Sequence, residues 1–324
     1  MLKKYGFWLK PLIGILIITL ITGLVWLGYL FNFSISKPIS IGSSYMTMNN
    51  EFYPVVNEQV ANYINNRQDF LYNRDPALSV SRQVEEIHSF IAKKVNVILL
   101  NPVDNKSIKL NRAINEAHKA GIKIIVVDSP IANKNVDCTI TSDNYKAGIL
   151  CARELLKKQK SAKILLLDQL NADSVVERMD GFLSTIKKAH NSKIKVVARL
   201  HTNGQSECSY PKVKQFLKKK QSFDTVMALN DRTAIGALAA INENKRKNSV
   251  YVYSVDGSQA MKKLIDSGHD KIFTVAQTPI KMGDQVAKIA YKLAHNKKVP
   301  RRITLPVTLI TQQNVNNYGI TGWQ

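Results

Sequence analysis

Carboxylate and amide side chains recur along the sequence directly after short apolar runs. They are Asn49, Asn50, Asn101, Asp128, Asp168, Asn230, Asp231, Asp256 and Gln277, and the aromatic pair Phe52 and Tyr53 follows the first run. Such groups bond in pairs to adjacent hydroxyls, and an aromatic ring packs on the C–H face of a cyclic polyol. Any single one is also a common turn former or helix cap. Their recurrence in one setting favours a binding site for a small ligand rich in hydroxyl groups.

No motif for catalysis, metal binding or a bound cofactor accompanies these residues. The sequence lacks a Gly-x-x-x-x-Gly-Lys loop, a Gly-x-Gly-x-x-Gly turn, a His-Glu-x-x-His pair and a Cys-x-x-Cys pair. We therefore expect a binding protein that is not an enzyme, with no catalytic residue, no metal and no cofactor. Cys151 is expected to lie in the middle of a helix, in the apolar core. A disulfide bridge between Cys138 and Cys208 can form only if these residues lie outside the cytoplasm.

After residue 38, strand-like apolar runs alternate with amphipathic helical stretches. The runs are 39–43, 70–72, 95–100, 122–127, 163–167, 195–200, 225–229, 250–255, 272–276 and 304–310. The helical stretches are 53–65, 81–93, 107–120, 145–158, 174–189, 210–219, 232–244, 259–267 and 280–295. Strict alternation predicts parallel sheets covered by helices on both faces. Roughly ten strands are at the upper limit for a single open sheet, which favours two sheets. The predicted fold class is α/β with two doubly wound parallel-sheet lobes, and ligands bind such sheets at the carboxyl ends of the strands.

Residues 12–33 are almost wholly apolar and uncharged, and Lys3, Lys4 and Lys10 precede them. A helix of this length spans a bilayer, and the basic flank is expected to stay in the cytoplasm. The sequence therefore predicts a single-pass transmembrane anchor within residues 1–36, with a binding domain at 37–324 outside the cell. A cleaved signal peptide is the alternative, because the small residues at 34–36 suit a signal peptidase.

The net charge of +22 falls by only three when the lysines ahead of the apolar stretch are left out. Basic residues such as Lys157, Lys158 and Lys160 lie on expected outer faces of helices, not in one stripe interleaved with aromatic residues. This placement is typical of a solvated face near anionic polymers, and it argues against nucleic acid as a partner.

Eight short motifs follow one another between residues 39 and 313. They are Asn49-Asn50-Glu51-Phe52-Tyr53, Asn101-Pro102-Val103-Asp104, Val127-Asp128, Ser142-Asp143-Asn144, Glu177-Arg178-Met179-Asp180-Gly181-Phe182, Asn230-Asp231 with Gly236-Ala237, Val255-Asp256-Gly257, and Ala276-Gln277-Thr278-Pro279. In combination they resemble the ribose-binding-protein branch of the type I periplasmic-binding family. In its anchored form the chain is also similar to clostridial xylose-sensing binding proteins.

The resemblance implies that a monosaccharide, a pentose or a hexose, binds between the two lobes. Two rings would stack on its apolar face, and six side chains would bond its hydroxyls. The rings are Phe52 and Tyr53, and the bonding side chains are Asn50, Asp128, Arg178, Asn230, Asp256 and Gln277. Arg178 enters only through the resemblance, because its position in the sequence is that of an arginine on a helix surface.

The resemblance also implies a three-strand hinge, with chain crossings near 142–144, near Gln277 and near Pro306. Lobe 1 is then expected at about 39–141 and 278–306, and lobe 2 at about 142–277 and 307–313. Closure on the hinge would enclose the ligand.

Three positions depart from the family's pattern. Ser129 stands where an arginine is usual, Val255 stands where an aromatic residue is usual, and no aromatic residue lies near Gly204. Fewer rings and one cation fewer leave room for a different hydroxyl pattern, so the resemblance does not single out ribose.

Two roles remain open after binding. A transport-associated protein delivers its sugar to an ABC permease, whereas a sensory protein docks on a membrane histidine kinase, which an uncleaved anchor would suit. The remaining alternatives are a small polar ligand that is not a sugar, or a ligand-free interaction module of a sensor complex. A transcription regulator of the same fold is disfavoured, because an apolar helix stands where a helix-turn-helix would be.

Overall fold

The computed structural model describes the chain except for residues 1–5, 31–37, 66–68, 220–221 and 245–249. The chain divides into two compact units, Met1–Pro38 and Ile39–Gln324. The described part of the first unit contains helix α1 (Gly6–Leu30). Among the described residues, no helix combines the length and the apolar character needed to cross a membrane. Positions 31–33 of the expected span lie outside those residues.

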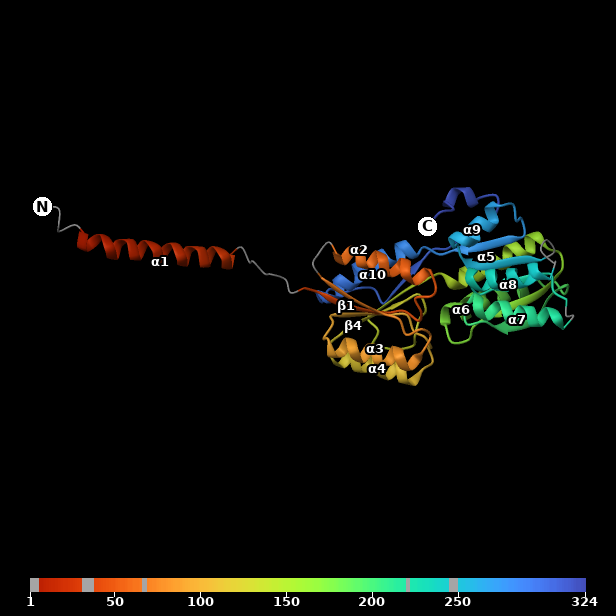
Figure 1. Cartoon of the computed structure of the whole chain (residues 1–324), viewed down its shortest axis with the longest axis horizontal. Helices are drawn as coiled ribbons and strands as arrows, with labels where there is room; N and C mark the ends of the chain where they lie inside the picture. Colours follow the sequence, from red (N-terminus) through yellow and green to blue (C-terminus); the bar gives the residue numbers. More distant parts are fainter. Residues whose placement is uncertain (1–5, 31–37, 66–68, 220–221, 245–249) are drawn as a thin grey trace. The chain divides into compact units, whose positions relative to one another are not determined.

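Lobe 1 is a sheet covered by helices on both faces. In the described part of the chain its strands are β1 (Ser40–Ser44), β2 (Phe70–Arg74), β3 (Val97–Leu100), β4 (Lys123–Val127), β5 (Cys138–Ser142) and β11 (Arg302–Leu305). Its helices are α2 (Phe52–Asn65), α3 (Val80–Ala92), α4 (Ile108–Lys119) and α10 (Pro279–Ala294). The strand order is β11-β5-β4-β3-β1-β2, and neighbouring strands run parallel. Helices α2 and α10 pack together on one face, and α3 and α4 pack on the other (Figure 1).

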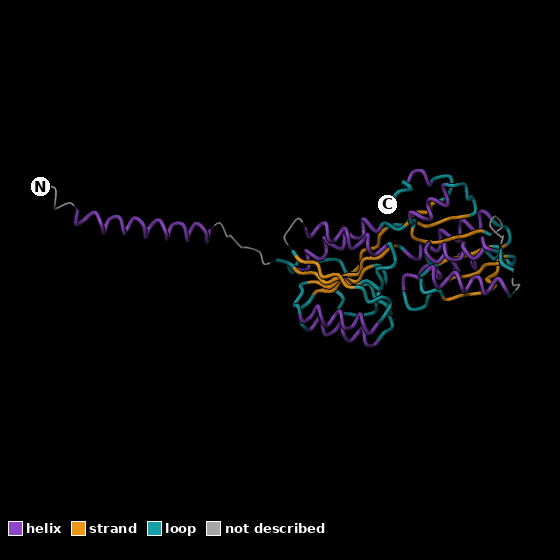
Figure 2. The backbone as a smooth tube through the Cα atoms, in the orientation of Figure 1, coloured by secondary structure: helices purple, strands orange, loops and turns teal. Residues whose placement is uncertain are grey.

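Lobe 2 repeats this plan with a second sheet. Its described strands are β6 (Ala162–Asp168), β7 (Ile194–His201), β8 (Thr225–Ala228), β9 (Tyr251–Asp256), β10 (Ile272–Ala276) and β12 (Thr308–Ile310). Its helices are α5 (Asn144–Lys158), α6 (Asp173–Lys188), α7 (Ser206–Lys218), α8 (Asp231–Glu243) and α9 (Gln259–Asp266), with the 3-10 turn η1 (Val315–Tyr318) beside α9. The strand order is β12-β10-β9-β8-β6-β7. Figure 2 shows the two sheets as separate groups of strands.

The expectation of two doubly wound lobes is confirmed, and three details differ. Strand β5 was not expected, because its sequence Cys-Thr-Ile-Thr-Ser does not form an apolar run. The expected strand 304–310 is two strands, β11 and β12, which belong to different sheets on either side of Pro306. Strand β12 runs antiparallel to β10, so lobe 2 is not purely parallel.

The cysteines are free, and Cys151 is fully buried in α5 as expected. The bridge between Cys138 and Cys208 does not form, because Cys138 lies in β5 of lobe 1 and Cys208 lies in α7 of lobe 2. These two elements belong to different lobes.

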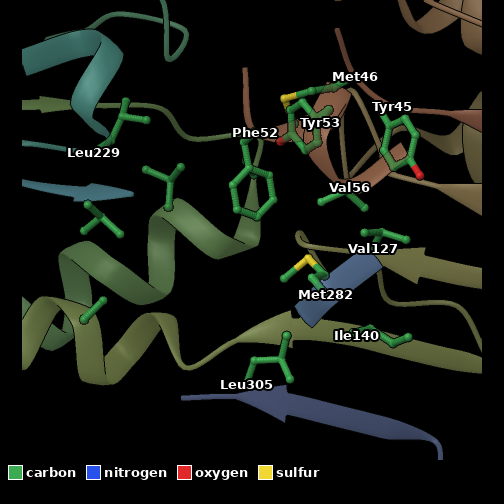
Figure 3. Packing of buried hydrophobic residues seen from close by; sticks show 14 of the residues in the cluster. Tyr45, Met46, Phe52, Tyr53, Val56, Val127, Ile140, Leu229, Met282 and Leu305 are labelled. Carbon is green, nitrogen blue, oxygen red and sulfur yellow. The ribbon is translucent and has the colours of Figure 1, made fainter. Parts of the chain in front are cut away.

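Buried side chains alternate between the two faces of the central strands. On β6, Ile164 and Leu166 face the cluster under α5 and α6, whereas Leu165 and Leu167 face the cluster under α7, α8 and α9. This alternation is the pattern of a strand covered on both faces. The first cluster also includes lobe 1 residues such as Val56, and Figure 3 shows part of it. The apolar core therefore continues from one lobe to the other.

Helices α5 and α6 approach closely enough that glycine is required where they cross. A Cβ atom on Gly148 would lie 1.9 Å from the backbone oxygen of Arg178, and a Cβ on Gly181 would lie 2.1 Å from that of Tyr145. Real Cβ atoms do not make such contacts, so either substitution would push the helices apart. The crossing thus fixes the position of α6, which carries Arg178.

We expect Gly148→Ala to lower the free energy of unfolding by about 2 kcal/mol, because the methyl group overpacks this crossing. Urea denaturation followed by circular dichroism measures the change. Arg153→Ala, on the exposed side of the same helix, is the matched control and should change stability by about 0.5 kcal/mol or less. Equal stabilities of the two variants would contradict the close crossing.

Candidate functional site

A cavity lies where the carboxyl ends of strands from both lobes meet. Its empty space is about 440 Å³, counting the part open to solvent. The eight residues that the resemblance assigns to the ligand all line it: Asn50, Phe52, Tyr53, Asp128, Arg178, Asn230, Asp256 and Gln277. The rest of the lining is Met46, Gln169, Ala172, Ser174, Val175, Asn203, Gly204, Gln205 and Leu229. The lining thus combines residues of both lobes, and many of its members carry hydrogen-bonding side chains.

Asp128 ends β4 and presents a carboxylate to the cavity from lobe 1. The Tyr53 hydroxyl donates to its Oδ2 atom at 3.1 Å, and Asn101 Nδ2 lies 3.5 Å from the same atom. Its Oδ1 atom is buried and has no hydrogen-bond partner among the described residues. The backbone of Asp128 has φ +66°, which is costly for a residue with a side chain. The free Oδ1 atom of this buried carboxyl group is suited to accept a hydrogen bond from a ligand hydroxyl.

Asp256 and Gln277 face the cavity together from lobe 2, at the ends of β9 and β10. Gln277 Nε2 donates to Asp256 Oδ1 at 2.8 Å, and Gln277 Oε1 is buried with no partner in the described structure. Burial, and after it the neighbouring Asp231 carboxyl, raise the pKa of Asp256 to about 8. The Asp256 side chain therefore retains its proton at neutral pH and can donate a hydrogen bond, beside the free acceptor of Gln277.

Arg178 supplies the cation of the cavity from α6. Its side chain is buried, its Nε donates to Asn144 Oδ1 at 2.8 Å, and its Nη1 donates to the Leu229 carbonyl at 2.9 Å. These two bonds fix the plane of the guanidinium. Burial raises the pKa of Asp128 and of Asp256, and the Arg178 charge opposes both increases.

Aromatic rings form the apolar wall of the cavity. Phe52 and Tyr53 open α2 with ring centroids 5.5 Å apart at 87°, and Tyr45 stacks on Tyr53 at 5.7 Å. Figure 3 shows these rings together with Met46 at one end of the apolar cluster. Each ring contacts another ring, which restricts its movement. A flat apolar face of a ligand would therefore pack on a fixed surface.

Two of the expected residues are occupied by local backbone contacts. The Asn230 side chain accepts from Thr233 N at 2.9 Å as the cap of α8 and donates to the Gly204 carbonyl at 3.1 Å. Asn50 Oδ1 accepts from Phe52 N at 3.1 Å. Both residues line the cavity, and at these atoms they act as the caps and turn formers that strand-end amides commonly are.

Other strand-end residues lie outside the cavity lining. Asp168 accepts from Arg199 Nε at 3.1 Å and contacts His201 Nδ1 at 2.6 Å. Asp231 accepts from Ser258 N at 2.7 Å and from Thr274 Oγ1 at 2.6 Å. These carboxylates hold loops and strands together beside the site.

Sequence reasoning missed Gln169 and Gln205, which line the cavity from the loops after β6 and β7. Gln205 Oε1 is buried with no partner among the described residues, so it is another spare acceptor. The Asn203-Gly204 pair just ahead of it is a turn signal, and both residues have positive φ. That signal could have pointed to the loop, although not to the direction of Gln205.

Within the described residues, no group of His, Cys, Asp and Glu side chains is arranged to hold a metal ion. The polar side chains of the cavity are instead amides, the carboxyls of Asp128 and Asp256, the Arg178 guanidinium and the hydroxyls of Tyr53 and Ser174, which bind hydroxyls and carbonyls.

Comparison with known families decides the class of the protein. The family of the periplasmic binding protein domain matches residues 41–298. The chain belongs to this family. It is 28% identical over 284 residues to the ribose import binding protein of Bacillus subtilis (strain 168), which covers 86% of this chain and 88% of that protein. It is 25% identical over 249 residues to the D-xylose-binding periplasmic protein of Escherichia coli (strain K12), 74% of each.

Solved structures of the family share the fold. An ABC transporter solute binding protein from Agrobacterium vitis with bound D-fucose has a TM-score of 0.78 and 26% identity, covering 86% of this chain and 97% of that one. One from Mycobacterium smegmatis with bound glycerol has a TM-score of 0.81 at 23% identity, covering 88% and 99%. The resemblance to the ribose-binding branch is thereby confirmed. The family binds solutes without transforming them, so the expectation of a non-enzyme is also confirmed.

The raised pKa of Asp256 predicts a pH-dependent contribution to stability. The folded protein holds this proton up to about pH 8, whereas the unfolded chain releases it near pH 4. The stabilising contribution is therefore complete below pH 4 and is lost as the pH rises through 8. Asp256→Asn mimics the neutral carboxyl, so its melting temperature relative to wild type should rise between pH 5 and pH 8. Thermal unfolding across this range measures the difference.

Asp266→Asn removes one exposed aspartate from α9 and is the control for the loss of a carboxylate. The melting temperature of Asp256→Asn relative to wild type could instead stay constant with pH or fall as the pH rises. Either result would contradict a buried, neutral Asp256.

Proposed function

We propose that the chain binds a monosaccharide, a pentose or a hexose, between its two lobes outside the cytoplasm, and delivers it to an ABC permease. The observation that carries this proposal is the set of spare, buried hydrogen-bonding atoms that converge on one small cavity. Asp128 Oδ1, Gln277 Oε1 and Gln205 Oε1 are acceptors without partners in the described structure. Leaving such atoms unpaired costs about 1–3 kcal/mol each, and sugar hydroxyls would satisfy them.

The relatives support the same class of ligand and partner. Proteins named for ribose import, D-xylose binding and D-apiose import match this chain over more than half of its length. The structure from Agrobacterium vitis with D-fucose belongs to an ABC transporter. Several different sugars are named among these relatives, which agrees with the departures at Ser129 and Val255 from the usual pattern.

Closure of the lobes would complete the site, and bonds already link them beside the cavity. Asn171 Nδ2 of lobe 2 donates to the Val103 carbonyl of lobe 1 at 3.1 Å, and Asn105 N donates to the Asn171 carbonyl at 3.2 Å. Ser174 N donates to Ser129 Oγ at 3.3 Å. We infer that these bonds form on closure and break when the sugar leaves.

Calorimetric titration of residues 39–324 with a panel of pentoses, hexoses and myo-inositol tests the ligand class. We expect at least one aldose to bind, and we expect Asp128→Asn to weaken its affinity about 10- to 100-fold, because an acceptor oxygen is replaced by an amide nitrogen that cannot accept a hydrogen bond. Asp180→Asn, an exposed aspartate on the same helix as Arg178, should leave the affinity within about twofold.

No heat with any aldose would overturn the sugar proposal. Binding of myo-inositol alone would leave the alternative of a polar ligand that is not a sugar, and no binding at all would leave the alternative of a ligand-free interaction module.

The membrane anchor at residues 12–33 and a histidine-kinase partner stay predictions of the sequence. The relatives support import, since their names refer to import or to periplasmic binding. We therefore place the permease ahead of the kinase as the partner.

Affinity capture of the tagged full chain from native membranes tests the partner. We expect permease subunits to be recovered, and we expect their recovery to change when the bound sugar is added. Mass spectrometry of the same sample gives the amino end of the captured chain. Recovery of a histidine kinase with a chain that retains residues 1–36 would favour sensing, and a mature end near Lys37 would exclude the anchor.

A further inference from the structure

The residues after β12 return to the binding site. From η1 the chain runs to Trp323 and Gln324, and Figure 1 shows this stretch at the end of the colour scale, from beside α9 to the mark C. We call residues 315–324 the closing segment. None of its residues belongs to the motifs that mark the site in the sequence.

A buried lysine fixes the closing segment to lobe 2. Lys262 on α9 is fully buried, and its Nζ donates to the Tyr318 carbonyl at 3.2 Å, the Gly322 carbonyl at 2.7 Å and Gln324 Oε1 at 2.9 Å. Gln259 Nε2 adds a bond to the Thr321 carbonyl at 3.0 Å. An ammonium group inside a protein requires such acceptors, so α9 and the segment hold each other in place.

Gln324 then reaches the backbone of two cavity residues. Its Nε2 donates to the Gln277 carbonyl at 2.7 Å and lies 3.4 Å from the Asp256 carbonyl. The amide fits because Gly257 stands beside it, where a Cβ would lie 2.6 Å from Gln324 Nε2. Gln324 thus joins the ends of β9 and β10, which carry the two lobe 2 side chains bonded to each other in the cavity.

Trp323 crosses from lobe 2 to lobe 1. Its ring meets the Phe52 ring edge-on, with centroids 5.9 Å apart at 80°. Phe52 is already held on another side by Tyr53, at 5.5 Å and 87°. Trp323 also lines a neighbouring cavity together with Asn50 and Asp256, with an empty space of about 650 Å³ counting the part open to solvent. The indole therefore lies at the border of the binding site and in contact with one of its rings.

We propose that the closing segment is a working part of the sugar site: Trp323 is a positioning residue that holds Phe52 against the cavity, and Gln324 aligns the strand ends that carry Asp256 and Gln277. Because Trp323 is fixed to lobe 2 and Phe52 belongs to lobe 1, this contact also favours the closed arrangement. The inference rests on the proposed function for its effect on affinity, while the ring contact itself can be tested without any ligand.

The contact is tested by fluorescence of the full chain. The sequence has tryptophan at positions 8, 26 and 323, so Trp8→Phe with Trp26→Phe leaves Trp323 as the sole emitter. In this background we expect Phe52→Ala to raise the acrylamide quenching constant about twofold, because the ring that covers the indole is lost. Phe70→Ala, a phenylalanine 53% exposed on β2, is the control and should leave quenching unchanged. Equal quenching in Phe52→Ala and in the control would overturn the contact.

The effect on binding is tested by stopped-flow and calorimetry with the aldose that binds wild type best. We expect Trp323→Ala to weaken affinity about tenfold, mainly through faster dissociation, because an aromatic pair and its buried area are lost from the closed complex. Trp323→Phe should restore most of the affinity, and Gln324→Ala should weaken binding in the same direction. The calorimetric stoichiometry of Trp323→Ala should equal that of wild type, which separates a positioning role from a loss of folded, binding-competent protein.

The two proposals fail in different ways. If wild type binds an aldose and Trp323→Ala binds it equally well, the role of the closing segment is overturned and the sugar proposal stands. If wild type binds no aldose, the sugar proposal falls, and the quenching result alone decides whether Trp323 holds Phe52.

Discussion

The burial of opposite charges in one small cavity is the constraint on which the rest of the structure depends. The Arg178 guanidinium faces the carboxyls of Asp128 and Asp256, and charges removed from water are tolerated only when each is bonded or neutralised. Burial raises the pKa of both carboxyls, to about 8 for Asp256, and the Arg178 charge opposes both increases. The cavity therefore combines one fixed cation with two carboxyls that burial pushes toward their neutral form.

This arrangement explains why the backbone around the site departs from ordinary preferences. Asp128 and Asp256 take positive φ, at +66° and +146°, and such strain persists only where surrounding contacts enforce it. The α5–α6 crossing enforces the position of Arg178, since Gly148 and Gly181 allow a separation that side chains would forbid. Asn144, at the start of α5, accepts a hydrogen bond from the Arg178 guanidinium, which the crossing holds in position. Fold and site are therefore set by the same packing.

The sequence predicted the helices within a few residues, because an amphipathic period repeats over many positions and averages out local exceptions. It missed β5, whose polar residues Thr141 and Ser142 are buried where the strand lies between β4 and β11. At the site, residue type and position after a strand identified part of the lining, but not which atoms remain free. Asn230 caps α8 while Gln277 keeps a spare oxygen, and this difference depends on neighbours far away in the chain. Arg178 required the family resemblance, because the direction of its side chain follows from a helix crossing that no local pattern encodes.

The closing segment supplies an aromatic ring beside the site that the site's own motifs lack. The sequence departs from the family by lacking rings at Val255 and near Gly204, whereas Trp323 brings a ring against Phe52 from outside the motifs. Ligand affinity in a hinged protein depends on the population of the closed state, and a contact between lobes worth about 1.4 kcal/mol changes that population tenfold. Such a contact acts on every ligand that needs closure, whereas hydrogen-bonding side chains such as Asp128 and Arg178 would discriminate among hydroxyl patterns. We therefore infer that the contact between Trp323 and Phe52 controls affinity, so that Trp323→Ala would change the strength of binding without changing which sugar is preferred.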